Sequence, residues 1–295
     1  MDRPPLARSR NSTNGRLYLS TLRLAAGLLA RTLPEAAARL AVEVFARPRR
    51  SRGSAAPPQV PGLTPRALRI PFEGALLHGW IFGEGPTVLL VHGWEGQAAQ
   101  LAPLIGPLVA RGQRVVAFDH FAHGQSPGSR STLPQMARAV LTVGRAVGPL
   151  QAVAGHSLGG TAAALALTWG LEAARCVLFC PPMEVPPFAR AVAAGLGLSD
   201  AVAARMLARL GREVGPLEAL DLRRVAPRLR APLLLLHDEG DREVPFAHGQ
   251  AVAAAWPGGH LLPLRGLGHR RLLRDPAVIQ AVVEFVAPDA LALSA

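Results

Sequence analysis

The chain has 295 residues, of which 49% are hydrophobic, and this composition excludes a mostly disordered protein while allowing one sizeable core. Its formal net charge of +12 lies mainly in the N-terminal part, because residues 1–69 carry 13 arginines and only three acidic residues. The other 226 residues carry 19 arginines and 17 acidic residues, so their charges nearly balance. No recognition motif or row of aromatic residues accompanies the arginines, which argues against nucleic-acid binding.

Residues 1–64 form a basic arm and linker ahead of the predicted body of the protein. Leu17 to Phe45 is rich in leucine and alanine, which predicts one helix broken near Pro34, or two short helices. Arginines recur often enough in this segment to exclude a membrane-spanning helix, and no convincing cleavage site marks a signal peptide. Residues 47–65 contain several prolines, arginines and glycines and predict a flexible linker.

Two interpretations of the arm stay open. Residues 16–45 form a basic amphipathic helix that touches an anionic membrane surface, or they form an additional helical element that packs on the body. We favour the second interpretation. We therefore expect a cytoplasmic protein, with peripheral contact at the inner membrane face as the alternative.

Short apolar runs alternate with helical stretches through the body, residues 65–287. Fully apolar strands are typical of a sheet covered on both faces, so the pattern predicts an α/β fold with a mostly parallel central sheet. Strands are predicted at 67–72, 75–82, 87–91, 114–119, 150–154, 175–180, 232–237 and 260–264, and helices at 97–111, 133–147, 161–167 and 276–286. Residues 288–295 are a C-terminal tail.

The alternation stops at residues 181–230, about fifty residues of mainly alanine, leucine and arginine. The periodicity of this segment predicts two or three short helices. We interpret them as a small helical cap inserted over the sheet edge, with longer connecting helices as the alternative.

Gly155-His156-Ser157-Leu158-Gly159 joins a predicted strand to a predicted helix. A Gly-x-Ser-x-Gly sequence in this setting predicts a tight turn that exposes the serine hydroxyl at the positive end of the helix. A glycine-rich turn with an incidental serine is the alternative.

A serine becomes nucleophilic when a base removes its proton and a third group holds that base. Asp241 follows the 232–237 strand, at the edge of the sheet where Ser157 is expected, and we prefer it to Asp238 and Glu239 as the third group. His269 follows the last predicted strand in a loop at the same edge, and it is the candidate base.

Cys176 and Cys180 flank an apolar segment and predict buried, reduced thiols. They are the only cysteines, and the histidines outside the motifs show no metal-ligand spacing. We expect no metal and no cofactor.

Together these motifs resemble the α/β-hydrolase superfamily, in its bacterial esterase, lipase and serine-aminopeptidase-like branch. The resemblance covers roughly residues 65–287 and has the chain order of that fold, serine, then acid, then histidine. It is carried by His92-Gly93-Trp94, by Asp119 before His123-Gly124-Gln125-Ser126, by Gly155 to Gly159, by Asp241, and by Gly268-His269.

The resemblance implies a role for each site residue. Ser157 is implied as the nucleophile, His269 as the general base and later acid, and Asp241 as the carboxylate that orients the imidazole. The backbone N–H groups of Trp94 and Leu158 would form the oxyanion hole. Asp119 is expected to organise its loop, and support of the elbow and the oxyanion loop is expected from His92, Gly93, Gly155, His156 and Gly159.

The function that these expectations favour is hydrolysis of a carboxylic ester through an acyl-enzyme intermediate. A thioester or a small amide could use the same groups. The alternatives are a non-catalytic binding protein of the same fold and a membrane-docked lipid hydrolase. The partner would be a small ester-type molecule, and the sequence does not indicate an oligomeric state.

Overall fold

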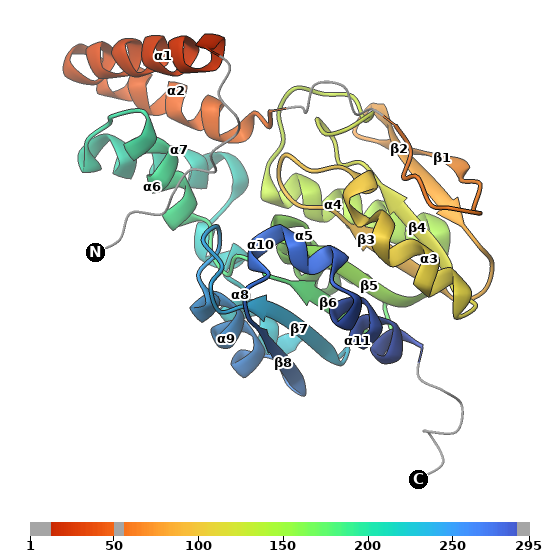
Figure 1. The fold of residues 1–295 in the computed structure, drawn as a ribbon. Coiled ribbons are helices and arrows are strands. Elements are labelled where there is room, and N and C mark those ends of the chain that lie inside the picture. The colour runs from red at the N-terminus through yellow and green to blue at the C-terminus, as the bar shows by residue number, and fades with distance from the viewer. Residues whose placement is uncertain (1–12, 50–55, 288–295) are drawn as a thin grey trace. The chain divides into compact units, whose positions relative to one another are not determined.

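The computed structural model describes residues 13–49 and 56–287 (Figure 1). Contacts between residues divide the chain into two compact units. One, the sheet unit, comprises Pro48–Met183 and Leu222–Ala295, and the other, the helical unit, comprises Met1–Arg47 and Glu184–Asp221. The predicted C-terminal tail, 288–295, lies outside the described residues, as do parts of the predicted arm and linker.

The described part of the sheet unit contains an eight-stranded sheet in the order β1-β2-β4-β3-β5-β6-β7-β8. The first two pairings, β1 with β2 and β2 with β4, are antiparallel, and the others are parallel. This confirms the mostly parallel α/β sheet. The strands are β1 (Arg66–Phe72), β2 (Ala75–Phe82), β3 (Thr87–Val91), β4 (Arg114–Phe118), β5 (Leu150–His156), β6 (Cys176–Phe179), β7 (Leu233–Asp238) and β8 (Gly259–Leu264).

The central strands are apolar because both of their faces are covered. All five residues of β3 are buried, and alternate side chains point to opposite sides of the sheet. Val88 and Leu90 join the hydrophobic cluster that includes residues of α3 (Ala102–Ala110) and α11 (Pro276–Val286). Contacts of β3 with α4 (Leu133–Val147) and α5 (Leu158–Thr168) cover it as well.

Short connections complete the sheet unit and bring its loops to the carboxyl ends of the strands. They are η1 (Ala98–Leu101), α8 (Leu222–Val225), η3 (Ala226–Arg228), α9 (Phe246–Ala255), α10 (Gly268–Arg271) and η4 (Leu272–Arg274). Because parallel strands end at the same edge of the sheet, the segments after β3, β5, β7 and β8 meet there.

The helical unit combines the N-terminal arm with the inserted segment. The predicted break at Pro34 is present, since α1 (Thr13–Thr32) ends before α2 (Pro34–Ala46) begins. The inserted segment contains three helical elements, α6 (Pro186–Gly195), α7 (Asp200–Val214) and η2 (Leu217–Leu220). The helix α2 packs on α6 and α7. Glu35 of α2 forms an ion pair with Arg205 of α7. This unit ends at Asp221, and α8 packs on α5 in the sheet unit, so the predicted segment 181–230 is divided between the two.

No helix among the described residues is long and apolar enough to cross a membrane.

Candidate active site

Ser157 lies in a strained turn between β5 and α5. Its φ of 53° and ψ of −130° fall in a region that side-chain-bearing residues rarely adopt, at a cost of about 1–3 kcal/mol. Backbone hydrogen bonds stabilise the turn, because Ser157 N–H donates to Phe179 O over 2.8 Å and Gly160 N–H donates to Ser157 O over 2.8 Å. Leu158 begins α5, so Ser157 lies at the positive end of that helix.

The glycines on either side of Ser157 allow the chain to approach itself closely. A Cβ atom on Gly155 would lie 2.6 Å from Gly160 Cα, and one on Gly159 would lie 2.1 Å from His92 O. Both distances are shorter than van der Waals contact, so any larger residue would push the strand, the helix or the loop after β3 out of position.

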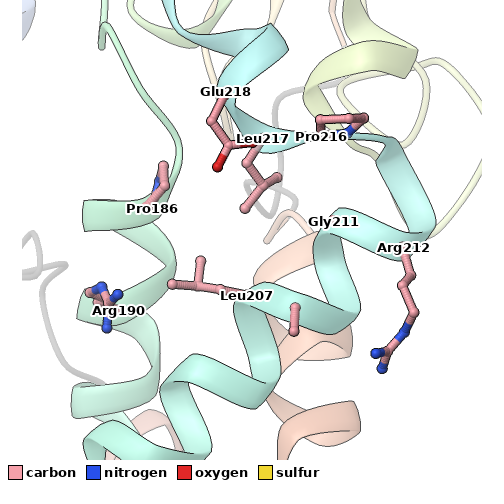
Figure 2. A pocket seen from close by; sticks show the side chains of 9 residues that line it. Pro186, Arg190, Leu207, Gly211, Arg212, Pro216, Leu217 and Glu218 are labelled. Carbon is pink, nitrogen blue, oxygen red and sulfur yellow. The ribbon is translucent and has the colours of Figure 1, made fainter.

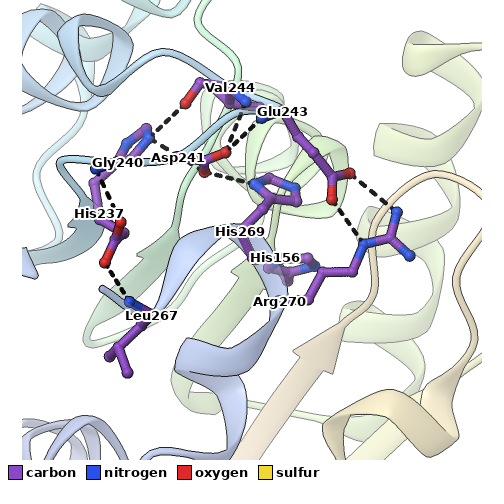
Figure 3. A network of polar contacts seen from close by, with 10 residues as sticks. His156, His237, Gly240, Asp241, Glu243, Val244, Leu267, His269 and Arg270 are labelled. Carbon is purple, nitrogen blue, oxygen red and sulfur yellow. Dashed lines mark hydrogen bonds and ion pairs between the residues drawn. The ribbon is translucent and has the colours of Figure 1, made fainter. Parts of the chain in front are cut away.

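Asp241 and His269 are hydrogen-bonded to one another, over 2.7 Å between Asp241 Oδ2 and His269 Nδ1 (Figure 3). The other carboxylate oxygen, Oδ1, accepts N–H groups from Glu243 at 2.7 Å and Val244 at 3.0 Å. Burial alone would raise the pKa of the Asp241 carboxyl, but the hydrogen bond from His269 and the two backbone donors hold this pKa below its ordinary value. The carboxylate is therefore charged and fixed beside the imidazole.

Asp238, the alternative acid, forms hydrogen bonds with partners other than His269. Its Oδ1 accepts Gly240 N–H at 2.9 Å, and its Oδ2 accepts Leu267 N–H at 2.7 Å. Both oxygens thus stabilise backbone, and Asp238 joins the loop after β7 to the loop after β8. Of the acids after β7, the structure brings Asp241 to His269.

His156 connects the serine turn to the histidine loop. Its Nε2 lies 2.8 Å from His269 O, and the two rings lie 4.8 Å apart. Burial, followed by the nearby His269, lowers the pKa of His156 to about 3, so its ring is neutral at ordinary pH. The hydrogen bonds among the described residues do not include one between the Ser157 hydroxyl and the His269 ring. Such contacts often tighten only when substrate is bound.

The loop after β3 lies against the serine turn. A Cβ atom on Gly93 would lie 2.9 Å from Ser157 Cβ, so glycine allows the loop that continues to Trp94 to approach Ser157 closely. Within the part of the chain that the structure describes, the N–H groups of Trp94 and Leu158 donate no hydrogen bond. Two N–H groups beside Ser157 are therefore available to a ligand.

Buried histidines and Asp119 support this loop. His92 Nε2 accepts His120 N–H at 3.0 Å, so its Nδ1–H donates to Gly93 O at 2.7 Å. Burial lowers the pKa of His92 to about 4. Asp119 accepts N–H groups from Ala98 at 2.8 Å and Gln125 at 2.7 Å, which is an organising role of the kind expected for it.

His120 has no role in the sequence motifs, and its neighbours explain its burial. It lies edge-on against Phe118 and His92, at ring-centroid distances of 4.8 and 4.7 Å. Neither of its ring nitrogens has a hydrogen bond within the described residues. It fills space under the loop as a neutral ring.

One group of side chains in the described part of the chain could hold a metal ion by distance, since donor atoms of Cys180, His237 and Asp241 lie within 4.8 Å of one another. Burial raises the pKa of the Cys180 thiol far above its ordinary range, so the thiol stays protonated and is a poor ligand. Asp241 is already bound to His269. These residues therefore fit a hydrogen-bonded cluster better than a metal centre. Both cysteines are buried and unpaired, as predicted.

A separate pocket of about 500 Å³ lies within the helical unit, between α6, α7 and η2 (Figure 2). None of the candidate site residues lines it. Its lining is formed by Pro186, Arg190, Leu207, Ala208, Gly211, Arg212, Pro216, Leu217 and Glu218.

Comparison with known proteins gives the same fold. Residues 86–216 match the family described as the alpha/beta hydrolase fold. The putative carbamate hydrolase RutD of Variovorax paradoxus is 37% identical over 90 residues, which are 28% of this chain and 34% of that protein. The match thus spans about a third of that relative's length.

Solved structures resemble the chain over most of its length. An esterase from Pyrococcus furiosus has a TM-score of 0.63 at 20% identity, covering 82% of this chain and 97% of its own. A monoacylglycerol lipase from Paleococcus ferrophilus has a TM-score of 0.57 at 23% identity, covering 72% of this chain and 98% of its own. At these identities the likeness establishes the fold.

Proposed function

We propose that this chain, a member of the α/β-hydrolase superfamily, is a serine hydrolase that cleaves a carboxylic ester through an acyl-enzyme intermediate. Ser157 would act as the nucleophile, His269 as the base, and Asp241 as the residue that orients the base. A thioester or a small amide would suit the same groups, and the proposed reaction needs no cofactor.

The reaction would proceed in two halves. Ser157 Oγ attacks the ester carbonyl carbon while His269 Nε2 takes the hydroxyl proton, and Asp241 offsets the charge that the imidazole gains. The N–H groups of Trp94 and Leu158 donate to the oxygen that becomes negative. His269 then returns the proton to the leaving alcohol, and an activated water molecule repeats the sequence to release the acid.

The observation that supports this proposal most strongly is the 2.7 Å hydrogen bond between Asp241 and His269. It arises between two loops at the edge of the sheet that also carries the strained Ser157 turn. A carboxylate that fixes one imidazole nitrogen leaves the other nitrogen free to act as a base.

Substitution of Ser157 by alanine tests the assignment. We expect Ser157→Ala to lower the hydrolysis of p-nitrophenyl butyrate by at least about 10⁴-fold and to abolish labelling by a fluorophosphonate probe. Ser131 is a suitable control, since it is buried and its hydroxyl has no hydrogen bond within the described residues. Equal activity and labelling in Ser157→Ala and Ser131→Ala would reject the proposed nucleophile.

The names of the similar proteins suggest the first substrates to try. Esterases and a lipase occur among the structures with this fold, and the partial sequence relative is called a carbamate hydrolase. A panel of acyl esters of increasing chain length, together with one aryl carbamate, would therefore define the acyl group that is accepted.

A second candidate function, hydrolysis of lipid at a membrane surface, is favoured by the outer face of α1. Leu24 and Leu28 lie one helical turn apart and are 76% and 68% exposed. Arg23 and Arg31 are exposed on the same helix. Exposed leucines next to arginines suit peripheral contact with an anionic membrane, such as the inner membrane face, through residues 16–45.

A further inference from the structure

Acidic and basic side chains join the two loops that carry Asp241 and His269. The loop after β7 contains Glu239 and Glu243, and the segment after β8 contains Arg265 and Arg270. Glu239 pairs with Arg265, with nitrogen–oxygen distances of 3.0 and 3.4 Å. Glu243 pairs with Arg270 through two bonds of 3.0 Å each, and Figure 3 shows this pair beside the His269 ring.

The second pair lies next to both Asp241 and His269. Arg270 directly follows His269 in α10, and Glu243 donates its own backbone N–H to Asp241 Oδ1 over 2.7 Å. A bidentate carboxylate–guanidinium pair fixes orientation as well as distance. Any displacement of Glu243 relative to Arg270 would therefore also displace Asp241 relative to His269.

We propose that Glu243 and Arg270 are positioning residues, which hold the Asp241–His269 hydrogen bond in place and balance charge beside the imidazole. The proposal rests on the proposed hydrolase function for its effect on rate. Its effect on the imidazole itself does not depend on turnover.

The charges around the pair are few. Arg270 is charged with or without Glu243, because a guanidinium stays protonated at any working pH. Its hydrogen bond to Glu243 raises the pKa of the guanidinium further, and Glu95 adds a weaker attraction. Glu95 is itself paired with Arg49 over 3.1 Å. No second anion that bonds Arg270 is present among the described residues, so loss of Glu243 would leave a net positive charge there.

The side chains near His269 include Asp241, His156 and His237. Asp241 bonds its ring, and the neighbouring His156 and His237 are kept neutral by burial, which lowers the pKa of each. Glu243 and Arg270 are therefore charges beside this site that a substitution can change without touching Asp241 or His269.

Removal of each partner has an opposite electrostatic effect. In Glu243→Gln the positive charge of Arg270 disfavours protonation of His269, so the acid limb of the kcat profile moves to lower pH, by roughly half a unit. In Arg270→Gln the negative charge of Glu243 moves it to higher pH by a similar amount. Both variants lower kcat roughly three- to tenfold with little change in KM, because the geometry loosens while substrate contacts remain.

The matched controls are Glu239→Gln and Arg265→Gln, which break a pair of the same kind between the same two loops. They should change neither the pH profile nor kcat appreciably. The exchange Glu243→Arg with Arg270→Glu should restore part of kcat, and Arg270→Lys should lose less than Arg270→Gln. Equal effects in the control pair, or shifts of the same sign in both single variants, would overturn the positioning role.

The midpoint of the His269 ring titration, followed by NMR and assigned with His269→Gln, separates the two hypotheses. If the protein hydrolyses no ester and resists fluorophosphonate, the proposed function fails, while the opposite midpoint shifts still test the pair. If hydrolysis depends on Ser157 but the midpoints do not shift, the proposal on Glu243 and Arg270 fails alone.

Discussion

Asp238 and Asp241 lie three residues apart on one loop, and their hydrogen bonds separate their roles. Asp238 accepts two backbone N–H groups, from Gly240 and Leu267. Asp241 accepts two N–H groups with one oxygen and keeps the other for His269. The first arrangement stabilises loop structure, whereas the second also fixes the tautomer and orientation of a ring.

Substitution by asparagine should therefore lower kcat mainly at position 241 and the free energy of unfolding mainly at position 238. We expect Asp241→Asn to lower kcat by about 10⁴-fold, because an amide favours the wrong imidazole tautomer and cannot offset its charge. Asp238→Asn turns one acceptor of a backbone N–H into a donor, which should cost about 1–3 kcal/mol of unfolding free energy and less than tenfold in kcat. Steady-state kinetics and urea unfolding of both variants measure the difference. A larger loss of kcat in Asp238→Asn than in Asp241→Asn would reverse the assignment.

At the scale of elements, the sequence predicted those that carry local start and stop signals. The helix predicted at 133–147 agrees with α4 because Thr132 caps it by accepting Gln135 N–H and because Gly148, with φ of 90°, ends it. The strands predicted at 67–72 and 75–82 leave two residues between them, and these residues form the turn between β1 and β2 because Glu73 and Gly74 both have positive φ, as a hairpin requires.

Elements without such signals were missing from the prediction. The helix α9 is almost uniformly small or apolar, with no polar face to mark its period, and α10 has only four residues. In the site, Ser157, Asp241 and His269 could be chosen from their motifs and chain order. The pair of Glu243 and Arg270 could not, because it joins the loop after β7 to α10, 27 residues apart in sequence, and their contact depends on the folded sheet.

The outer face of α1 permits a test of the proposed membrane contact. We expect the full chain to co-sediment with vesicles that contain phosphatidylglycerol, and the double variant Leu24→Ser, Leu28→Ser to bind about tenfold more weakly, since two leucines no longer enter the interface. Leu76→Ser is the control, because Leu76 is 48% exposed on β2. Equal binding by both variants would remove the membrane from consideration.

At the scale of the whole molecule, the chain contributes to the helical unit twice. Its N-terminal helices and its inserted helices are separated by more than a hundred residues of the sheet unit, yet α2 packs on α7. Periodicity gives the apolar face of each helix but not the distant helix that covers it. The sequence therefore predicted an arm and an insertion as separate features.

The buried neutral histidines of the sheet unit should make its stability depend on pH. Burial lowers the pKa of His92 to about 4 and that of His123 to about 3, from an ordinary value of 6.5, and that of His120 falls well below it. Between pH 6.5 and about 4 the unfolded chain binds protons that the folded chain does not. The free energy of unfolding therefore has its full value above pH 6.5. It falls as the pH drops through this range, by up to about 1.4 kcal/mol per pH unit for each histidine. Burial raises the pKa of Asp119, which opposes this trend wherever the folded chain keeps the carboxyl protonated and the unfolded chain does not.

Replacement of His120 by leucine isolates one of these groups. His120→Leu replaces the ring by an apolar side chain of similar volume and removes ring nitrogens that have no hydrogen bond within the described residues. We expect the free energy of unfolding, measured in urea from pH 7.5 to 4.5, to fall less steeply in this variant than in the unchanged protein, by about one proton's slope. His260→Gln, at an exposed position on β8, should keep the original slope. If all three proteins lost stability in parallel, protonation of His120 would not contribute to acid unfolding, and other buried groups would have to account for the loss.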